Sequence, residues 1–138
     1  MYETVLVGTD GSESANRAVE RALDTAELHD AQLHAITVVN TGRYGEPALS
    51  STELVLAELE DRGNEQLEEI ESEATDRGIE LTSNCFHGDP DKEIVRYADE
   101  VDADLIVLGY QGRTRPGSRI GSTADRVVRQ TDRAVLLI

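Results

Sequence analysis

Short apolar segments alternate with longer helical patterns along the whole chain. Residues 4–8 and 33–39 are rich in Val, Leu and Ile, whereas residues 12–29 between them place Ala, Val and Leu at the spacing of an amphipathic helix. Strands that alternate with helices form a parallel sheet, because each right-handed crossover lays its helix on one face of the sheet. The sequence therefore predicts an α/β fold with helices on both faces.

The later part of the chain continues this alternation. A half-polar alternating segment is expected to be an edge strand, and the most continuously apolar segment is expected to be a central strand. In such sheets, ligands bind beyond the carboxyl ends of the strands. We expect helices at 50–77, 90–99 and 122–131, an edge strand at 79–86, a central strand at 104–109 and a last strand at 134–138.

The composition excludes several classes of protein. The chain has 138 residues, enough for one domain with its own core, and it carries 28 acidic against 13 basic residues, a formal charge of −15. A nucleic-acid-binding protein usually has a basic footprint. No segment approaches the roughly 20 apolar residues of a membrane span, the first residues are not basic like those of a signal peptide, and Cys85 has no partner for an internal disulfide. We expect a cytoplasmic protein without nucleic-acid or membrane partners.

The basic residues are unusual in kind. Lys92 is the only lysine among the 13 basic residues, and the others are arginines. Dense carboxylates hold water and salt at a protein surface, and salt screens their mutual repulsion. This composition favours a halophilic source, although acidic surfaces also serve solubility in ordinary proteins.

A glycine-rich segment at 109–123 joins an apolar strand to a helix and contains four glycines. Glycine lets backbone N–H groups approach a ligand closely, and a helix N-terminus adds donors and partial positive charge for a phosphate. Residues 105–124 include no acidic residue but contain three arginines, Arg113, Arg115 and Arg119. This absence of repelling carboxylates predicts an anion site. The alternative is a plain connection whose arginines pair with neighbouring acids.

Several motifs occur in a fixed order: Val7-Gly8-Thr9-Asp10-Gly11-Ser12, Gly88-Asp89-Pro90, Gly109-x-x-Gly112, Gly121-Ser122 and a closing apolar strand. In this combination the whole chain resembles the universal stress protein family. The resemblance implies an open, Rossmann-like, five-stranded parallel sheet of order 3-2-1-4-5. It also implies a homodimer and, in one branch of the family, a pocket for ATP or another adenine nucleotide with Mg²⁺ on its phosphates.

The resemblance also implies roles for individual residues. Asp10 is expected near ribose and adenine with Thr9 beside it, Val39 against adenine, and Gly109 and Gly112 along the path of ribose and phosphate. The phosphates are expected at the backbone and hydroxyls of residues 121–123. The nucleotide-binding residues we expect are Thr9, Asp10, Val39, Gly109, Gly112, Arg113, Gly121, Ser122 and Thr123. Asp10 has an alternative role as a turn and helix-cap residue.

The chain departs from the family's pattern at one point. Eight residues separate Gly112 from Gly121, one fewer than in the pattern, so the phosphate contacts are expected to be displaced. This shortening keeps open a nucleotide-free family member that acts as a protein-interaction module. A nucleotide-dependent regulatory protein without efficient catalysis remains the main prediction. An adenylating enzyme is disfavoured, because residues 9–14 lack the Ser-Gly-Gly phosphate loop of such enzymes.

The last segment predicts a partner. Residues 134–138 are all apolar, and only Arg133 precedes them with a charge. The implied topology places this strand at the edge of the sheet, where an unprotected strand is normally covered. Pairing with the same strand of a second copy would cover it symmetrically and give a homodimer. The alternative is that helices and loops of the same chain cover it.

Overall fold

The computed structural model describes residues 1–41, 50–111 and 120–138, except for the side chains of residues 50–52. The predicted alternation of strands and helices is confirmed, with shifts of up to about two residues at the ends of elements. In chain order the elements are β1 (Thr4–Gly8), α1 (Glu13–His29), β2 (Gln32–Asn40), α2 (Ser50–Asp76), β3 (Leu81–Gly88), α3 (Pro90–Val101), β4 (Leu105–Leu108), α4 (Ser122–Gln130) and β5 (Ala134–Leu137).

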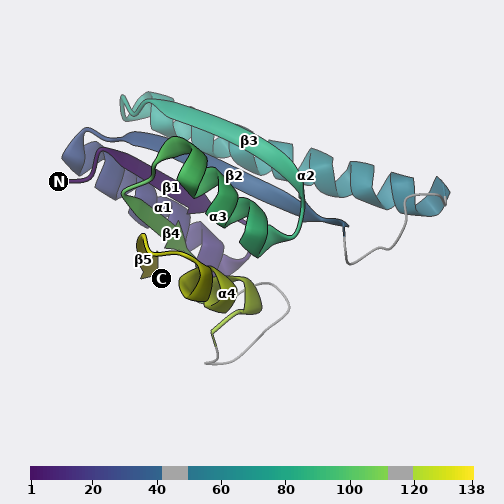
Figure 1. The fold of residues 1–138 in the computed structure, drawn as a ribbon. Coiled ribbons are helices and arrows are strands. Elements are labelled where there is room, and N and C mark those ends of the chain that lie inside the picture. Colours follow the sequence, from purple (N-terminus) through teal and green to yellow (C-terminus); the bar gives the residue numbers. More distant parts are fainter. Residues whose placement is uncertain (42–49, 112–119) are drawn as a thin grey trace.

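The strands form one parallel sheet in the order β3-β2-β1-β4-β5 (Figure 1). This is the order that the family resemblance implies. The chain builds outward from β1 on one side through β2 and β3, and on the other side through β4 and β5. The strand expected to be central, β4, lies between β1 and β5, and the middle strand of the sheet is β1. Both strands are buried, and apolar composition alone does not distinguish these two positions.

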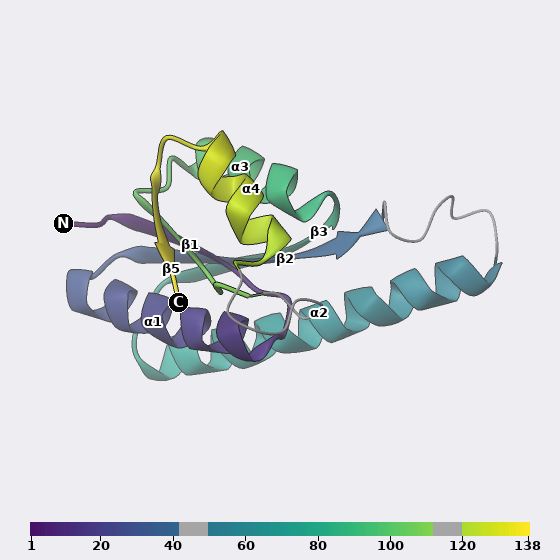
Figure 2. The same cartoon turned by 90° about the horizontal axis from the view of Figure 1, so that it is seen from below.

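The helices cover the two faces of the sheet in pairs. Figure 2 shows α1 and α2 on one face and α3 and α4 on the other. Alternating side chains of β1 serve both layers, because successive strand residues point to opposite faces. Val5 and Val7 pack in the cluster that contains α1 and α2 residues, whereas Leu6 packs in the cluster that contains Ile94 and Val127.

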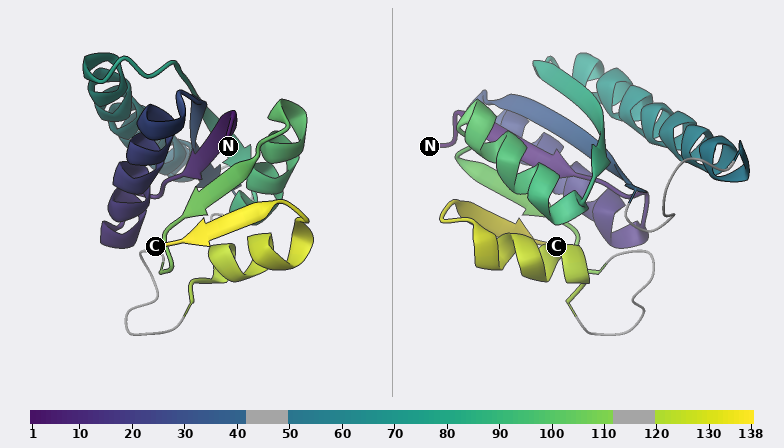
Figure 3. Two further views of the ribbon diagram at one scale, coloured as in Figure 1. Left: turned by 90° about the vertical axis from the view of Figure 1, so that its left-hand side faces the viewer. Right: turned by 45° about the vertical axis from the view of Figure 1, so that its right-hand side comes forward.

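The two outer strands are those predicted to be edges. The side chains of β3 are mostly half-buried, as its alternating sequence predicts. β5 lies beside β4 at the opposite margin, close to the C-terminus (Figure 3). Within the described residues, no helix has the length and apolar character needed to cross a membrane.

The start of α3 lies in the Gly88-Asp89-Pro90 motif. Asp89 stands at the N-cap and Pro90 in the first turn, but the Asp89 side chain makes no capping hydrogen bond. Its carboxylate lies 3.5 Å from Lys92 Nζ instead. The proline fixes the first turn because its φ angle already suits a helix.

Candidate functional site

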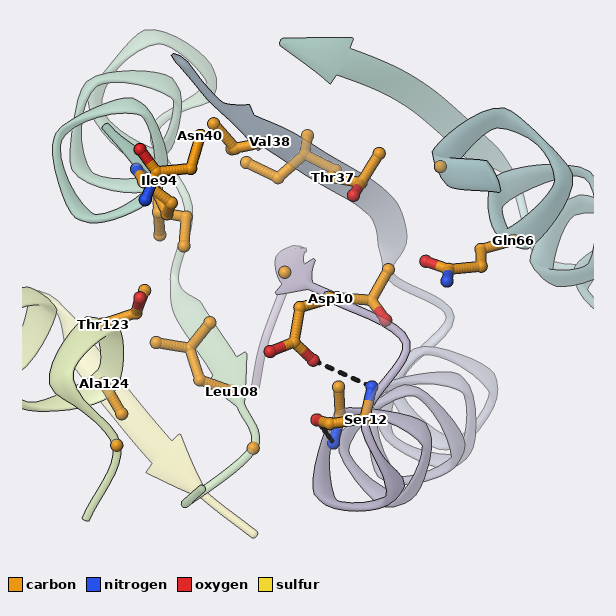
Figure 4. A pocket seen from close by; sticks show the side chains of 18 of the residues that line it. Asp10, Ser12, Thr37, Val38, Asn40, Gln66, Ile94, Leu108, Thr123 and Ala124 are labelled. Atoms are coloured by element: carbon orange, nitrogen blue, oxygen red, sulfur yellow. Dashed lines mark hydrogen bonds between the residues drawn. The ribbon is translucent and has the colours of Figure 1, made fainter. Parts of the chain in front are cut away.

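A cavity of about 680 Å³ opens at the carboxyl ends of the strands. Its walls include the ends of β1, β2 and β4 and the first turns of α1, α3 and α4 (Figure 4). The connection that leaves β1 leads to β2 on one side of the cavity, and the connection that leaves β4 leads to β5 on the other side. This crevice is therefore the switch point at which ligands of open α/β sheets bind.

Three helices begin at the cavity, and their first turns differ. In α1, the Ser12 hydroxyl accepts a hydrogen bond from the Ala15 backbone N–H at 3.2 Å. In α3, Asp91 and Glu93 place carboxylates in the first turn. In α4, the N-cap is Gly121, which offers no side-chain cap to the first N–H groups, and Asp125, the acidic residue of this first turn, is paired with Arg129 at 3.1 Å. An anion in the cavity therefore finds its most open helix N-terminus at α4.

Backbone hydrogen bonds fix this open end of α4. The carbonyl of Tyr110 accepts a hydrogen bond from the Gly121 N–H at 2.6 Å. The Tyr110 N–H donates to the carbonyl of Ile138 at 2.7 Å, and the Ile138 N–H donates to the carbonyl of Leu108 at 3.0 Å. The beginning of α4 is thus tied to the residues that follow β4 and β5.

The turn after β1 holds Asp10 at the cavity. The Asp10 Oδ1 atom accepts a hydrogen bond from the Ser12 N–H at 2.9 Å, and the Thr9 hydroxyl accepts one from the Gly11 N–H at 3.2 Å. Gly11 has a φ of +79°, which glycine adopts without strain. The structure thus shows the turn role that the sequence left as an alternative for Asp10, and Asp10 still lines the cavity as an exposed residue.

Gly109 lies at the end of β4, pressed against the start of α1. A Cβ atom at this position would overlap the Ser14 hydroxyl and lie 2.7 Å from the Ala15 backbone nitrogen. Glycine here is therefore required by the close packing of two elements, which is a different reason from the ligand approach expected from the sequence.

The charged groups of the cavity wall are few. Among the described residues that line it, Asp10 and Arg62 are the charged ones. α2 carries ten acidic residues and Arg62 as its one basic residue. Within the described part of the chain, Arg62 makes no ion pair, so its positive charge is available at the wall.

Comparison with known proteins gives the family. The model of the universal stress protein family matches residues 1–138. The chain belongs to this family. A universal stress protein of Methanocaldococcus jannaschii is 34% identical over 140 residues, which cover 100% of this chain and 82% of that protein.

Two solved structures of universal stress proteins are similar and hold ligands. One, in complex with cAMP, is 32% identical with a TM-score of 0.70, and the match covers 99% of this chain and 96% of that chain. The other, from Archaeoglobus fulgidus and in complex with dAMP, is 25% identical with a TM-score of 0.71, covering 99% and 98%.

In this universal stress protein, most of the predicted site residues surround one cavity. Its walls include Thr9, Asp10, Val39, Gly109, Gly121, Ser122 and Thr123. Gly112 and Arg113 lie outside the described residues. Contact of these residues with a nucleotide remains a prediction.

One wall of the cavity was not foreseen. It comes from α2, through Leu59, Arg62, Gly63 and Gln66. Site residues at strand ends can be predicted, because ligands of such sheets bind there. The sequence does not say which side of a 27-residue helix lies over the strand ends. Gly63 inside a helix and Arg62 among acidic neighbours were the available signals.

Proposed function

We propose that this universal stress protein binds an adenine nucleotide, ATP with Mg²⁺ in the first place, in the cavity at the switch point of the sheet. The observation that carries the proposal is the uncapped N-terminus of α4 facing a cavity at the carboxyl ends of the strands. Backbone N–H groups there, with the hydroxyls of Ser122 and Thr123, suit a phosphate.

The rest of the nucleotide follows from the arrangement of the walls. Asp10 lies between Thr123 and Gln66 in the cavity (Figure 4). Its carboxylate is proposed to bind the ribose hydroxyls. Val39 offers a buried apolar surface at the end of β2 to the base. The relatives solved with cAMP and dAMP support the class of ligand, since both are adenine nucleotides.

Magnesium is proposed here only as a partner of the phosphates. The described residues contain no group of three or more His, Cys, Asp and Glu side chains that could hold a metal ion. Asp10 is the carboxylate of the described wall. A bound cation would therefore be held mainly by phosphate oxygens and would neutralise their charge.

The nucleotide is proposed to act as a regulatory ligand. The described wall carries no histidine and only Asp10 as a carboxylate, a sparse set of groups for activating water. Binding would join α4, β1 and β2 through one ligand and so stabilise the fold. Action in the cytoplasm remains a prediction.

The test is to denature the purified protein and identify released nucleotide by chromatography and mass spectrometry. A second aliquot is melted with and without Mg-ATP in concentrated salt. We expect a released adenine nucleotide or a rise in melting temperature. If no nucleotide is released and the melting temperature does not rise, the alternative is favoured, a nucleotide-free interaction module.

We also propose that two copies pair through β5. This strand pairs with β4 on one side and is the last of the sheet. Its residues Val135, Leu136 and Leu137 are half-buried. Light scattering in concentrated salt is expected to give twice the mass of the chain, and a monomeric mass would contradict the proposal.

A further inference from the structure

The α2 wall forms the end of the cavity opposite the open helix. Figure 4 places Asp10 between Thr123 of α4 and Gln66 of α2. With phosphates at Thr123 and ribose at Asp10, the base of a nucleotide points toward Gln66. The groups at this end therefore decide which base is accepted.

Gly63 brings α2 close enough to form this end. A Cβ atom at residue 63 would lie 2.8 Å from Thr37 Cγ2, which is closer than real side chains approach. Gln66 follows three residues later and so lies on the same side of the helix. Thr37 and Val39, both buried in β2, share the face of the strand that points toward α2. With Leu59 and Arg62 of the same wall, they build an end in which the Gln66 amide lies among apolar surface, a hydroxyl and one guanidinium. Apolar surface with a few polar groups is typical of a small-molecule site.

The Gln66 side chain lies beside the turn after β1 and has no polar partner among the described residues. Its amide lies directly over Gly11, where a Cβ atom would overlap Gln66 Nε2. The side chain is half-buried, and within the described residues it makes no hydrogen bond. A half-buried amide with its donors and acceptor unused is a group that a ligand can satisfy.

We propose that Gln66 is the residue that selects the base, by pairing its amide with the edge of adenine. A glutamine amide accepts from the exocyclic amine of adenine while donating to a ring nitrogen beside it. This inference rests on the proposed nucleotide site. It adds a specificity-determining residue on α2, outside the strand ends and the glycine-rich segment.

The test measures the affinities for ATP and GTP by calorimetry, with the full chain in concentrated salt. The native protein is expected to prefer ATP. Gln66→Leu is expected to reduce the ratio of ATP to GTP affinity at least about tenfold, because a bidentate base contact is lost. Gln66→Glu is expected to shift the ratio further toward GTP, since a carboxylate accepts from the two donors of guanine but donates nothing to adenine.

The control is Asn64, an exposed amide on the same helix that does not line the cavity. Asn64→Leu and Asn64→Asp make matching changes and should leave the ratio unaltered. Because each variant is its own reference for the two nucleotides, partial unfolding does not alter the ratio. ATP binding with an unchanged ratio in both Gln66 variants would overturn this inference alone. No nucleotide binding by the native protein would overturn the proposed function and this inference with it.

Discussion

The hydroxyl of Ser14, in the first turn of α1, is hydrogen-bonded to both backbone groups of Gln111. It donates to the Gln111 carbonyl and accepts from the Gln111 N–H at 3.1 Å. Ser14 is buried, and Gly109 leaves room for it at the end of β4. This contact joins the start of α1 to the residues that leave β4, and both line the proposed nucleotide site.

Ser14→Ala is expected to destabilise the fold. The substitution removes the partner of the Gln111 N–H and leaves the Gln111 carbonyl with the Ser12 hydroxyl alone, at 3.4 Å. A buried donor left without a partner costs about 1–3 kcal/mol. The measurement is the free energy of unfolding by urea. Ser72→Ala, at an exposed position of α2, is the control. Equal effects of the two substitutions would contradict the structural role of Ser14.

Gly121→Val tests the position of the phosphates. The isopropyl group would stand beside the first N–H groups of α4 and hinder a phosphate from reaching them. We expect the affinity for ATP to fall at least about tenfold, since hydrogen bonds to charged groups are strong. Adenosine, which has no phosphate, should bind the variant and the native protein alike. An unchanged ATP affinity would place the phosphates elsewhere.

Arg62→Glu tests the charge of the α2 wall. It replaces the basic group of the described wall by a carboxylate, which repels a nucleotide. We expect an ATP affinity about tenfold lower at low salt, with a smaller effect at high salt because ions screen the repulsion. Arg21→Glu, at an exposed position of α1 outside the cavity, makes the same change of charge. Equal losses for both variants would indicate a general effect of net charge.

Arg77 holds together carboxylates of two helices. Its guanidinium lies 3.2 Å from Glu20, 2.8 Å from Asp24 and 2.8 Å from Glu73. Burial, and then Glu73, already raise the pKa of the Glu20 carboxyl. Arg77→Ala leaves these acids facing one another, so we expect a lower melting temperature, and a larger loss at low salt than at high salt.

Arg17→Ala, at an exposed position of α1, is the control for Arg77. A loss that does not depend on salt would contradict the electrostatic account. The halophilic source predicted from the composition remains a prediction, and the native protein should gain stability with added salt if it is right.

His34 gives a pH dependence. The Tyr97 hydroxyl accepts a hydrogen bond from the Asn84 amide at 3.2 Å and lies within hydrogen-bond distance of His34 Nδ1, at 2.8 Å. Burial lowers the pKa of His34 below its usual 6.5. His34 therefore takes up a proton more readily in the unfolded chain than in the folded one. The free energy of unfolding falls as the pH drops below about 6.5.

The measurement compares melting temperatures at neutral pH and near pH 5 for the native protein and for His34→Gln. The variant should show a smaller loss on acidification. His29→Gln, which replaces a histidine beside Tyr2, is the control. An equal acid sensitivity in His34→Gln and the native protein would contradict this assignment.

The fold could be predicted from the sequence because its determinants are local. The spacing of Ala18, Ala22 and Ala26 marks the buried side of α1, and the apolar strand segments mark the sheet. The strand order was implied by the family resemblance and not by these patterns. The middle position of β1 depends on pairing between distant segments, which composition does not encode.

The candidate site was only partly predictable for the same reason. Residues at strand ends, such as Asp10 and Val39, follow from topology once the strands are known. Gly109 lines the cavity, but the contact with Ser14 that requires a glycine joins distant parts of the chain. The approach of Gly63 to Thr37, which brings Gln66 to the cavity, is likewise a tertiary contact: a glycine inside a helix indicates a close approach but does not identify the partner.

Calorimetric titration of Mg-ATP into the native protein in concentrated salt tests the central claim most directly. The account predicts saturable binding of one nucleotide per chain, weakened at least about tenfold by Gly121→Val while the affinity for adenosine is unchanged. The absence of saturable binding for ATP, ADP and AMP at millimolar concentration would contradict it.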